Sequence, residues 1–442
     1  MRFTLALHSK LVAYPVLCCS ALIGASALPA QPLRVDITEG ARAPLQISLV
    51  ATQPDSDPAV TTSNSAAQLL GVIEADLAGT ALYTLIRQSA APGTQLENAL
   101  SDARARASQG LVWFTTAPND ANNLRAECSY IDVFSGAAEA RAVFIVPSAQ
   151  ARRAAHKCAD MVFTHTSGEP GYFDSQIALI TDEGLATDPK RRVTIVDSDG
   201  FNLRAVSAPD QMPAMPAISR NGLHAAYLAI EGTETALIIL DRTTGRLQRV
   251  QIPGALPSAP VFAPDGRSLL LTLSRDGNAD IFRFELASGT FTPLTNAFGT
   301  DTAASYAPDG SKVVFQSDRS GQPQIYTMNA DGSDQQRVSF GDGSFATPVW
   351  SPRGDRLAFT FVTDNGMQIG TMRSDGTAMR LLPAPWQDES PSWAASGTQL
   401  IFTRTTRSSP PRLWVTDLTG QRQRQLPLPM AASEASWSGL LP

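Results

Sequence analysis

The 442-residue sequence has few of the residues from which catalytic and metal centres are built. Only His156, His165 and His224 follow the first 30 residues, and no two stand at metal-ligand spacing with further histidine or cysteine nearby. The sequence also lacks the Gly-x-Ser-x-Gly motif of serine hydrolases and a phosphate-binding glycine loop followed by lysine. We therefore predict no catalytic residues, no metal and no cofactor.

Long apolar runs are equally scarce, and the only one stands at the amino terminus. Arg2 and Lys10 accompany an apolar run over residues 11–23, and small residues follow up to Ala30. This order is typical of a secretory signal peptide, so residues 1–30 are predicted to be removed on export. A membrane anchor is the alternative interpretation. No later stretch is long and apolar enough to span a bilayer, so we expect no membrane insertion once the signal is removed.

Basic residues are too few for a protein that binds nucleic acid. Residues 1–30 hold two basic residues and no acidic one, which leaves 41 acidic against 33 basic residues in the mature chain. This balance argues against nucleic acid and anionic lipid as partners. It suits an exported protein that contacts neutral or basic protein surfaces.

Two cysteines, Cys128 and Cys158, remain after the predicted signal. In an oxidising compartment they could form a disulfide, and two buried free thiols are an equal alternative. The choice depends on the distance between their Cα atoms, which the sequence does not give.

A repeat of about 44 residues dominates the second part of the chain. Aromatic residues recur at nearly constant spacing, at Phe262, Tyr306, Trp350, Trp393 and Trp437. Turn sequences such as Pro-Asp-Gly follow them, and short apolar runs lie between the turns. A period of this length with four short strands per unit is the signature of a β-propeller blade.

Six blades are predicted, of which one is split between the two ends of the repeat region. Five units begin near residues 216, 258, 302, 346 and 390. The sixth has middle strands over 176–180 and 193–197 but no opening strand before them. Residues 434–439 supply that strand, and borrowing it from the carboxyl end would close the ring without a free sheet edge.

Residues 31–164 lack the repeat and predict a small α/β domain with a mixed sheet. Strands are expected over residues 33–37, 45–50, 111–114 and 131–134, and helices over 64–85 and 150–162. The predicted fold is therefore a signal peptide at 1–30, a small N-terminal α/β domain at 31–164, and a six-bladed β-propeller at 165–442 closed by the C-terminal strand.

Several motifs match the pattern of one protein family. The run Ala151–Asp160 fits an Arg-x-x-Ala-His-x-x-x-Asp helix, and Thr166–Asp174 fits a segment that leads into a first blade. Residues 71–77 fit a first helix, and residues 317–326 fit a blade loop and strand. In this order the motifs resemble those of the TolB family, the periplasmic component of the Tol–Pal system.

The resemblance implies a non-catalytic periplasmic protein, expected to be a monomer. It would bind a Pal-like lipoprotein through the propeller and a TolA-like protein through its amino-terminal segment. Such contacts would support outer-membrane integrity and cell division. A secreted propeller enzyme of the lactonase or glycan-lyase kind, with its site in the central channel, is the alternative.

Two sets of partner-binding residues are predicted. We expect the polar loops between second and third strands to lie exposed on one rim around the channel mouth. Their candidate contact residues are Ser167, Glu169, Arg275, Asp276, Asp318, Arg319, Asp364, Asn365 and Arg407. The second set is the alternating segment Leu33, Arg34, Val35, Asp36 and Ile37, which suits strand addition to a partner's sheet. Pairing inside its own domain is the alternative.

A further group on the predicted helix over 150–162 attracts attention. Arg153, His156 and Asp160 share one helix face. We expect them to make polar contacts where this helix meets the propeller, rather than to act in catalysis.

Overall fold

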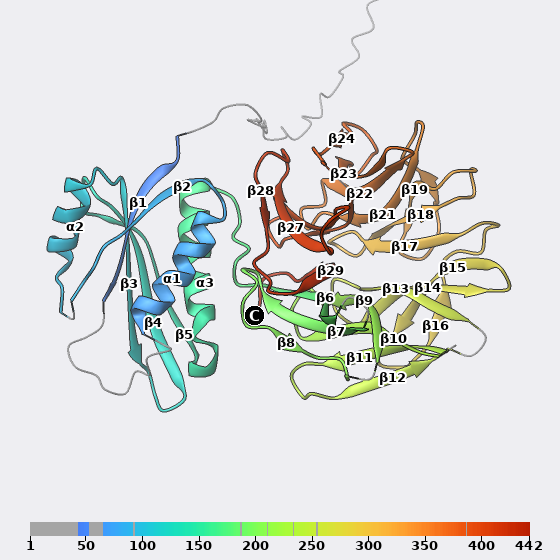
Figure 1. The fold of residues 1–442 in the computed structure, drawn as a ribbon, viewed down its shortest axis with the longest axis horizontal. Helices are drawn as coiled ribbons and strands as arrows, with labels where there is room; N and C mark the ends of the chain where they lie inside the picture. Colours follow the sequence, from blue (N-terminus) through green and yellow to red (C-terminus); the bar gives the residue numbers. More distant parts are fainter. Residues whose placement is uncertain are drawn as a thin grey trace, which may run out of the picture. The chain divides into compact units, whose positions relative to one another are not determined.

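The computed structural model describes residues 43–52, 65–91, 93–185, 188–209, 211–232, 234–252, 255–385 and 387–442. These residues form a mixed α/β domain and a six-bladed propeller (Figure 1). The predicted signal at 1–30 and the predicted strand over 33–37 lie outside the described residues.

The α/β domain is built on a five-stranded sheet in the order β2-β1-β3-β4-β5. Strand β1 (Leu45–Thr52) lies parallel to both β2 (Tyr83–Arg87) and β3 (Gly110–Pro118). Strands β4 (Asn123–Asp132) and β5 (Ala138–Pro147) continue the sheet in antiparallel fashion. The predicted mixed sheet is confirmed.

Helices cover both faces of this sheet. Helices α1 (Ala66–Ala78) and α3 (Ala151–Ser167) pack on one face, and α2 (Leu96–Ala105) packs on the other. A single turn of 3₁₀ helix, η2 (Ser148–Gln150), leads directly into α3.

The predicted helix over 64–85 is too long. Helix α1 begins after Ser65, whose hydroxyl accepts a hydrogen bond from the Gln68 amide, and it ends at Ala78. A turn follows in which Ala81 has a left-handed φ of 54°. The apolar residues after that turn belong to β2, so what was read as one helical face is divided between a helix and a strand.

A disulfide between Cys128 of β4 and Cys158 of α3 joins the sheet to the helix. The Cα atoms of the two residues are 5.7 Å apart, and 30 positions separate them in the sequence. The question that the sequence left open is thereby answered in favour of the disulfide. In the chain-entropy view, a closed loop of this size stabilises the folded state by about 3–4 kcal/mol.

The propeller has six four-stranded sheets. Blade one consists of β29 (Ala431–Trp437), β6 (Gln176–Leu185), β7 (Asp188–Asp197) and β8 (Arg204–Ala205). Blade two consists of β9 (Met212–Ile218), β10 (His224–Glu231), β11 (Glu234–Asp241) and β12 (Leu247–Gln251). Blade three consists of β13 (Leu256–Phe262), β14 (Ser268–Arg275), β15 (Asn278–Glu285) and β16 (Phe291–Pro293).

The other three blades follow the same order from the innermost strand outward. Blade four consists of β17 (Asp301–Tyr306), β18 (Lys312–Ser317), β19 (Gln324–Asn329) and β20 (Gln336–Arg337). Blade five consists of β21 (Ser344–Trp350), β22 (Arg356–Thr363), β23 (Gly366–Arg373) and β24 (Arg380–Leu381). Blade six consists of β25 (Gln387–Trp393), β26 (Gln399–Thr405), β27 (Arg412–Asp417) and β28 (Gln423–Gln425).

Because the strands of a blade alternate in direction, the ring has two different ends. We call the end that carries the turns between first and second strands, and between third and fourth strands, the turn rim. The opposite end carries the loops between second and third strands and the connections from one blade to the next, and we call it the loop rim. Apolar side chains fill the space between neighbouring blades, as where Ile281 of blade three meets Val313 and Phe315 of blade four.

Each innermost strand contains a β-bulge at the same place in its blade. One non-glycine residue in each bulge has a left-handed φ between 45° and 56°, namely Met215, Ala259, Ala303, Thr347, Ser390 and Glu434. A non-glycine residue in this region costs on the order of 1–3 kcal/mol. Repetition in all six blades shows that the bulge belongs to the fold, where it turns the inner strands toward the channel.

Strand β29 closes the ring by pairing with β6, with Trp437 opposite Ile177. The Trp437 side chain is 7% exposed, and its indole N–H donates to the hydroxyl of Ser175 at 2.9 Å. Its ring also meets the edge of Tyr172. The predicted split blade and the closure by the carboxyl-terminal strand are confirmed.

Replacement of Trp437 by alanine tests how much this closure stabilises the fold. The change leaves a cavity in the closing blade and removes the hydrogen bond to Ser175, so we expect a loss of about 3–5 kcal/mol in the free energy of unfolding. Urea denaturation measures it. Leu440→Ala is the matched control, because Leu440 lies three residues further on and is 46% exposed. Equal stability of the two variants would contradict the closing role of Trp437.

Candidate functional site

Five of the predicted contact residues lie exposed on the loop rim. Arg275 and Asp276 join β14 to β15, Asp364 and Asn365 join β22 to β23, and Arg407 follows β26. The loops of blades five and six border a groove of about 730 Å³, whose lining includes Asn365 and Arg407. For these residues the expected exposure and placement are confirmed, and binding of a partner there stays a prediction.

Two exposed aromatic residues on the same rim escaped the sequence analysis. Phe298 is 98% exposed in the connection from blade three to blade four, and Phe340 is 70% exposed in the connection from blade four to blade five. Each is followed by a glycine, so a Phe-Gly pair recurs in successive blade connections. That recurrence in polar surroundings was the signal that could have revealed them, because apolar side chains this exposed often mark contact surfaces.

Arg319 is not the exposed loop residue that was expected. Its guanidinium lies 2.6 Å from the carboxylate of Asp301, which is fully buried. It also donates to Gln335 and lies over the rings of Phe315 and Tyr326. The side chain is 19% exposed and serves first to neutralise a buried charge.

Its neighbour Asp318 is also engaged within the blade. The Asp318 carboxylate accepts the backbone N–H of Thr300 at 2.7 Å and so fixes the connection that enters blade four. The sequence pattern could not show either contact, because the partners are 18 residues away and the fold alone brings them together.

Ser167 and Glu169 lie on the turn rim, so the expectation that all six loops share one rim is wrong for this segment. Ser167 is the last residue of α3, and Glu169 forms an ion pair of 2.8 Å with Arg353 in the first turn of blade five. The physical reason is the split blade. Since its innermost strand comes from the carboxyl end, residues 167–171 lead into the second strand and arrive at the opposite end of the ring.

The loop-rim mouth of the channel opens into a cavity of about 490 Å³ that all six bulges line. Its charged lining residues are Arg191, Glu389 and Glu434. Burial, together with the charge of Glu434, raises the pKa of Glu389. Among the described lining residues there is no histidine, which a channel enzyme of the kind considered above would need.

Helix α3 meets the propeller through the three residues that the sequence singled out. Arg153 donates to both carboxylate oxygens of Asp174, at 3.0 and 2.9 Å. The carboxylate of Asp160 accepts the backbone N–H groups of Phe173 and Asp174, at 2.7 and 3.0 Å. The predicted polar contacts between this helix and the propeller are confirmed.

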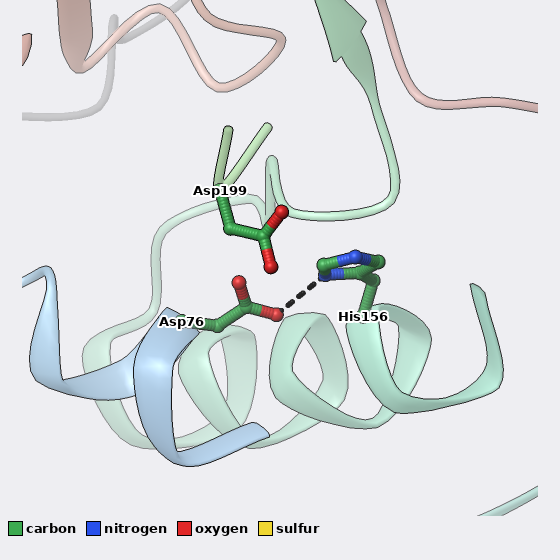
Figure 2. A group of neighbouring side chains, drawn as sticks. All are labelled: Asp76, His156 and Asp199. Carbon is green, nitrogen blue, oxygen red and sulfur yellow. Dashed lines mark hydrogen bonds and ion pairs between the residues drawn. The ribbon is translucent and has the colours of Figure 1, made fainter. Parts of the chain in front are cut away.

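His156 lies in a buried cluster of charges at the same junction (Figure 2). Its Nδ1 is 2.7 Å from the carboxylate of Asp76 in α1, and its Nε2 is 4.0 Å from Asp197 at the end of β7. Arg152 bridges Asp197, at 3.2 Å, and Asp199 in the following turn. Three carboxylates thus surround one imidazole and one guanidinium.

The charges around His156 determine its protonation. Burial alone would lower the pKa of His156, but the negative charge of Asp76, its hydrogen bond and the charges of Asp199 and Asp197 raise this pKa to about 9. Burial also raises the pKa of Asp76, against the effect of His156. We take His156 as the cation of the pair, because three carboxylates lie around it.

Ligand atoms of Asp76, His156 and Asp199 come within 4.8 Å of one another, as in many metal sites. Arg152 already neutralises Asp199, however, and the imidazole is hydrogen-bonded to Asp76. The arrangement therefore acts as an ion-pair cluster that joins two helices of the α/β domain to blade one.

Comparison with known proteins agrees with this architecture. The model of the TolB amino-terminal domain matches residues 33–139, and the model of the TolB beta propeller domain matches residues 163–441. The Tol-Pal system protein TolB of Zymomonas mobilis is 41% identical over 418 residues, which cover 93% of this chain and 91% of that protein. The chain belongs to the TolB family.

Other members of the TolB family match over different lengths. The Tol-Pal system protein TolB of Dinoroseobacter shibae is 36% identical over 271 residues, and the match spans 60% of this chain and 60% of that relative. The crystal structure of TolB from Acinetobacter baumannii has a TM-score of 0.76 at 24% identity and covers 90% of this chain and 97% of that chain. At that identity it supports the fold alone.

No helix among the described residues of this TolB family member combines the length and apolarity needed to cross a membrane.

The stability of this TolB family protein should depend on pH through His156. The folded state holds the His156 proton more tightly than the unfolded chain, so the contribution of the cluster is complete below the ordinary pKa of 6.5 and is lost as the pH rises toward 9. Burial raises the pKa of Asp160 to about 7, so its effect ends near that pH. We therefore expect the free energy of unfolding to fall between pH 7 and 9.

Denaturation curves across this pH range are compared for wild type, His156→Gln and His165→Gln. The His156 variant should lose the fall with pH even if its stability is lower throughout. His165 lies on the same helix and pairs with the more exposed Glu139, so its variant should keep the wild-type slope. The same slope in all three proteins would show that His156 does not carry the effect.

A further prediction separates the two kinds of arginine on the loop rim. Arg319→Ala leaves the Asp301 carboxylate buried without a counter-charge and should cost about 3–5 kcal/mol of unfolding free energy. Arg407→Ala removes an exposed side chain and should change stability by no more than about 0.5 kcal/mol. Thermal and urea unfolding measure both, and equal effects would contradict the structural role of Arg319.

Proposed function

We propose that this TolB family member is a periplasmic, non-catalytic protein that links an inner-membrane complex to a Pal-like, peptidoglycan-associated lipoprotein. In this role it supports outer-membrane integrity and cell division. The names of its relatives place them in the Tol–Pal system, and the predicted signal peptide agrees with a periplasmic location.

The observation that carries the proposal is the difference between the two ends of the ring. On the turn rim, blade residues contact the α/β domain: Arg152 of α3 reaches Asp197, and Arg422 of blade six donates to the Thr80 carbonyl. Among the described residues, the hydrogen bonds between the two domains all lie on the turn-rim side of the ring. A partner of the propeller would find its open surface there.

The chemistry of the loop rim suits a protein partner. Phe298 and Phe340 offer exposed aromatic anchors, and charged residues of both signs, such as Arg275, Asp364 and Arg407, stand in the loops. Anchors of this kind within a polar surround are typical of protein interfaces. The cavity at the loop-rim mouth of the channel is a less suitable site for catalysis, because its charged lining is limited to Arg191, Glu389 and Glu434 among the described residues.

The second proposed contact uses the segment Leu33–Ile37, which lies outside the described residues. Its alternation of apolar and charged residues suits addition to the edge of a partner's sheet, where main-chain hydrogen bonds give affinity. We assign it the TolA-like partner. The two contacts would then use different parts of the chain and be separable by mutation.

Two variants with opposite expected effects test the assignment of the two partners to different parts of the chain. The loop-rim variant Asp364→Lys with Arg407→Glu should weaken binding to the soluble domain of the Pal-like lipoprotein about tenfold or more and leave the TolA-like domain bound as before. Deletion of residues 31–37 should do the reverse. Calorimetric titration with each purified partner measures both affinities.

Arg267→Glu provides the matched control, because Arg267 is an exposed arginine in the first turn of blade three on the turn rim. It should bind both partners like the wild type. Wild-type affinity of the loop-rim variant for the lipoprotein would place that contact elsewhere. If the deletion abolished both contacts, the segment would be structural, and retained TolA binding would exclude it as the contact.

A further inference from the structure

A cavity of about 570 Å³ lies on the turn rim, where α3 meets blades one and two. Four arginines line it: Arg152 and Arg153 from the first turn of α3, Arg204 from β8, and Arg242 just after β11. Asp197 is the one acidic side chain among its described lining residues. Pro442 also lines the cavity, and its backbone oxygen accepts a hydrogen bond from Arg153 at 2.8 Å. No described residue of the loop rim contributes to this cavity.

The arginines from the two domains differ in how their charges are balanced. Arg152 is paired with Asp197 and Asp199, and Arg153 with Asp174. These two are therefore neutralised by carboxylates from blade one or its approach. The helix side of the cavity therefore has little net positive charge.

On the propeller side, neither Arg204 nor Arg242 forms an ion pair with a carboxylate among the described residues. Arg242 donates to the carbonyl of Gly222 and to the side-chain oxygen of Gln176 at 2.7 Å, both of which are neutral. Arg204 is exposed. Burial lowers the pKa of Arg242 and the like charge of Arg204 lowers it further, whereas the charge of Asp197 acts in the opposite direction. Two arginines that repel each other thus point to one concave surface.

Helix α3 adds to this positive potential. Its first turn contains no acidic residue, and the side chain of its N-cap, Gln150, makes no capping hydrogen bond. Acidic groups are normally favoured at this end of a helix and cations are not. Gln150 and Ala151 both line the cavity, so an anion bound there would meet the end of the helix as well as the arginines.

We propose that this cavity binds an oxyanion ligand, a carboxylate or a phosphate, through Arg204 and Arg242. Guanidinium groups present paired N–H donors that match the oxygens of either group. The volume is in the usual range for small-molecule sites and exceeds what a single inorganic anion needs. Since the lining comes from α3 and from blades one and two, a bound ligand holds the α/β domain to the propeller and stabilises the folded protein.

Titration calorimetry on the full mature protein at low ionic strength tests this site with two probes, citrate and pyrophosphate. Wild type should bind at least one of them, and the preferred probe tells whether the natural ligand carries carboxylates or phosphates. Arg204→Glu should weaken binding about tenfold or more, because it replaces attraction by repulsion. Arg267→Glu makes the same charge change on the same rim outside the cavity and should bind like the wild type.

Thermal unfolding with and without the probe supplies a second readout. The bound probe should raise the melting temperature of wild type and Arg267→Glu and leave that of Arg204→Glu unchanged. Arg204→Gln, which removes the charge without reversing it, replaces the glutamate variant if that protein fails to fold. The proposal is overturned if neither probe binds wild type at about 10 mM, or if the Arg204 variants bind as tightly as wild type.

Discussion

Hydrogen bonding between β29 and β6 joins two stretches of chain that lie about 250 residues apart in sequence. Without it, blade one would keep three strands and lack the innermost one, and a free sheet edge would face the channel. The six inner bulges form a ring only when β29 supplies the one at Glu434. The channel mouth, both rims and the inward contacts of neighbouring blades all depend on that pairing.

The short approach to β6 connects ring closure with the domain junction. Asp160 of α3 binds the backbone of Phe173 and Asp174, and the next residue, Ser175, accepts the indole N–H of Trp437. Ser198, after β7, donates its hydroxyl to the Phe173 carbonyl. One segment is therefore fixed from the helix, from the closing strand and from its own blade.

The parts of this fold that could be predicted are those that repeat or alternate. Aromatic spacing located five blades and the missing strand of the sixth, because each blade solves the same packing problem with the same turn. In the α/β domain, by contrast, each element occurs once, and one stretch of sequence can fit the periodicity of a helix although part of it forms a strand. The leucines before and after the turn at Ala81 continue one helical periodicity, although the chain leaves the helix there. The strand β5 was not identified, since half of its residues face solvent.

The candidate sites were harder to predict, because the sequence does not distinguish an exposed loop arginine from one that neutralises a buried carboxylate. Arg319 and Arg407 both stand in polar loops after a second strand, yet one neutralises Asp301 and the other is exposed. The two roles can be told apart only in the fold, which brings a carboxylate of another strand close to Arg319. The rim of Ser167 and Glu169 was predicted wrongly for a topological reason, since residues 167–171 precede the second strand of the split blade and do not join its second and third strands.

The two ends of the ring differ in their contacts, although every blade has the same strand order. On the turn rim, charged residues at blade ends contact the α/β domain: Asp197 and Asp199 bind Arg152 of α3, and Arg422 donates to the Thr80 carbonyl. On the loop rim, two of the connections between blades expose a phenylalanine. The blades of a repeat share the same strand arrangement, but their loops can differ, because exposed loop residues contribute little to the packing of the core. Binding specificity can therefore change at the loop rim while the helix contacts and the closing strand stay as they are.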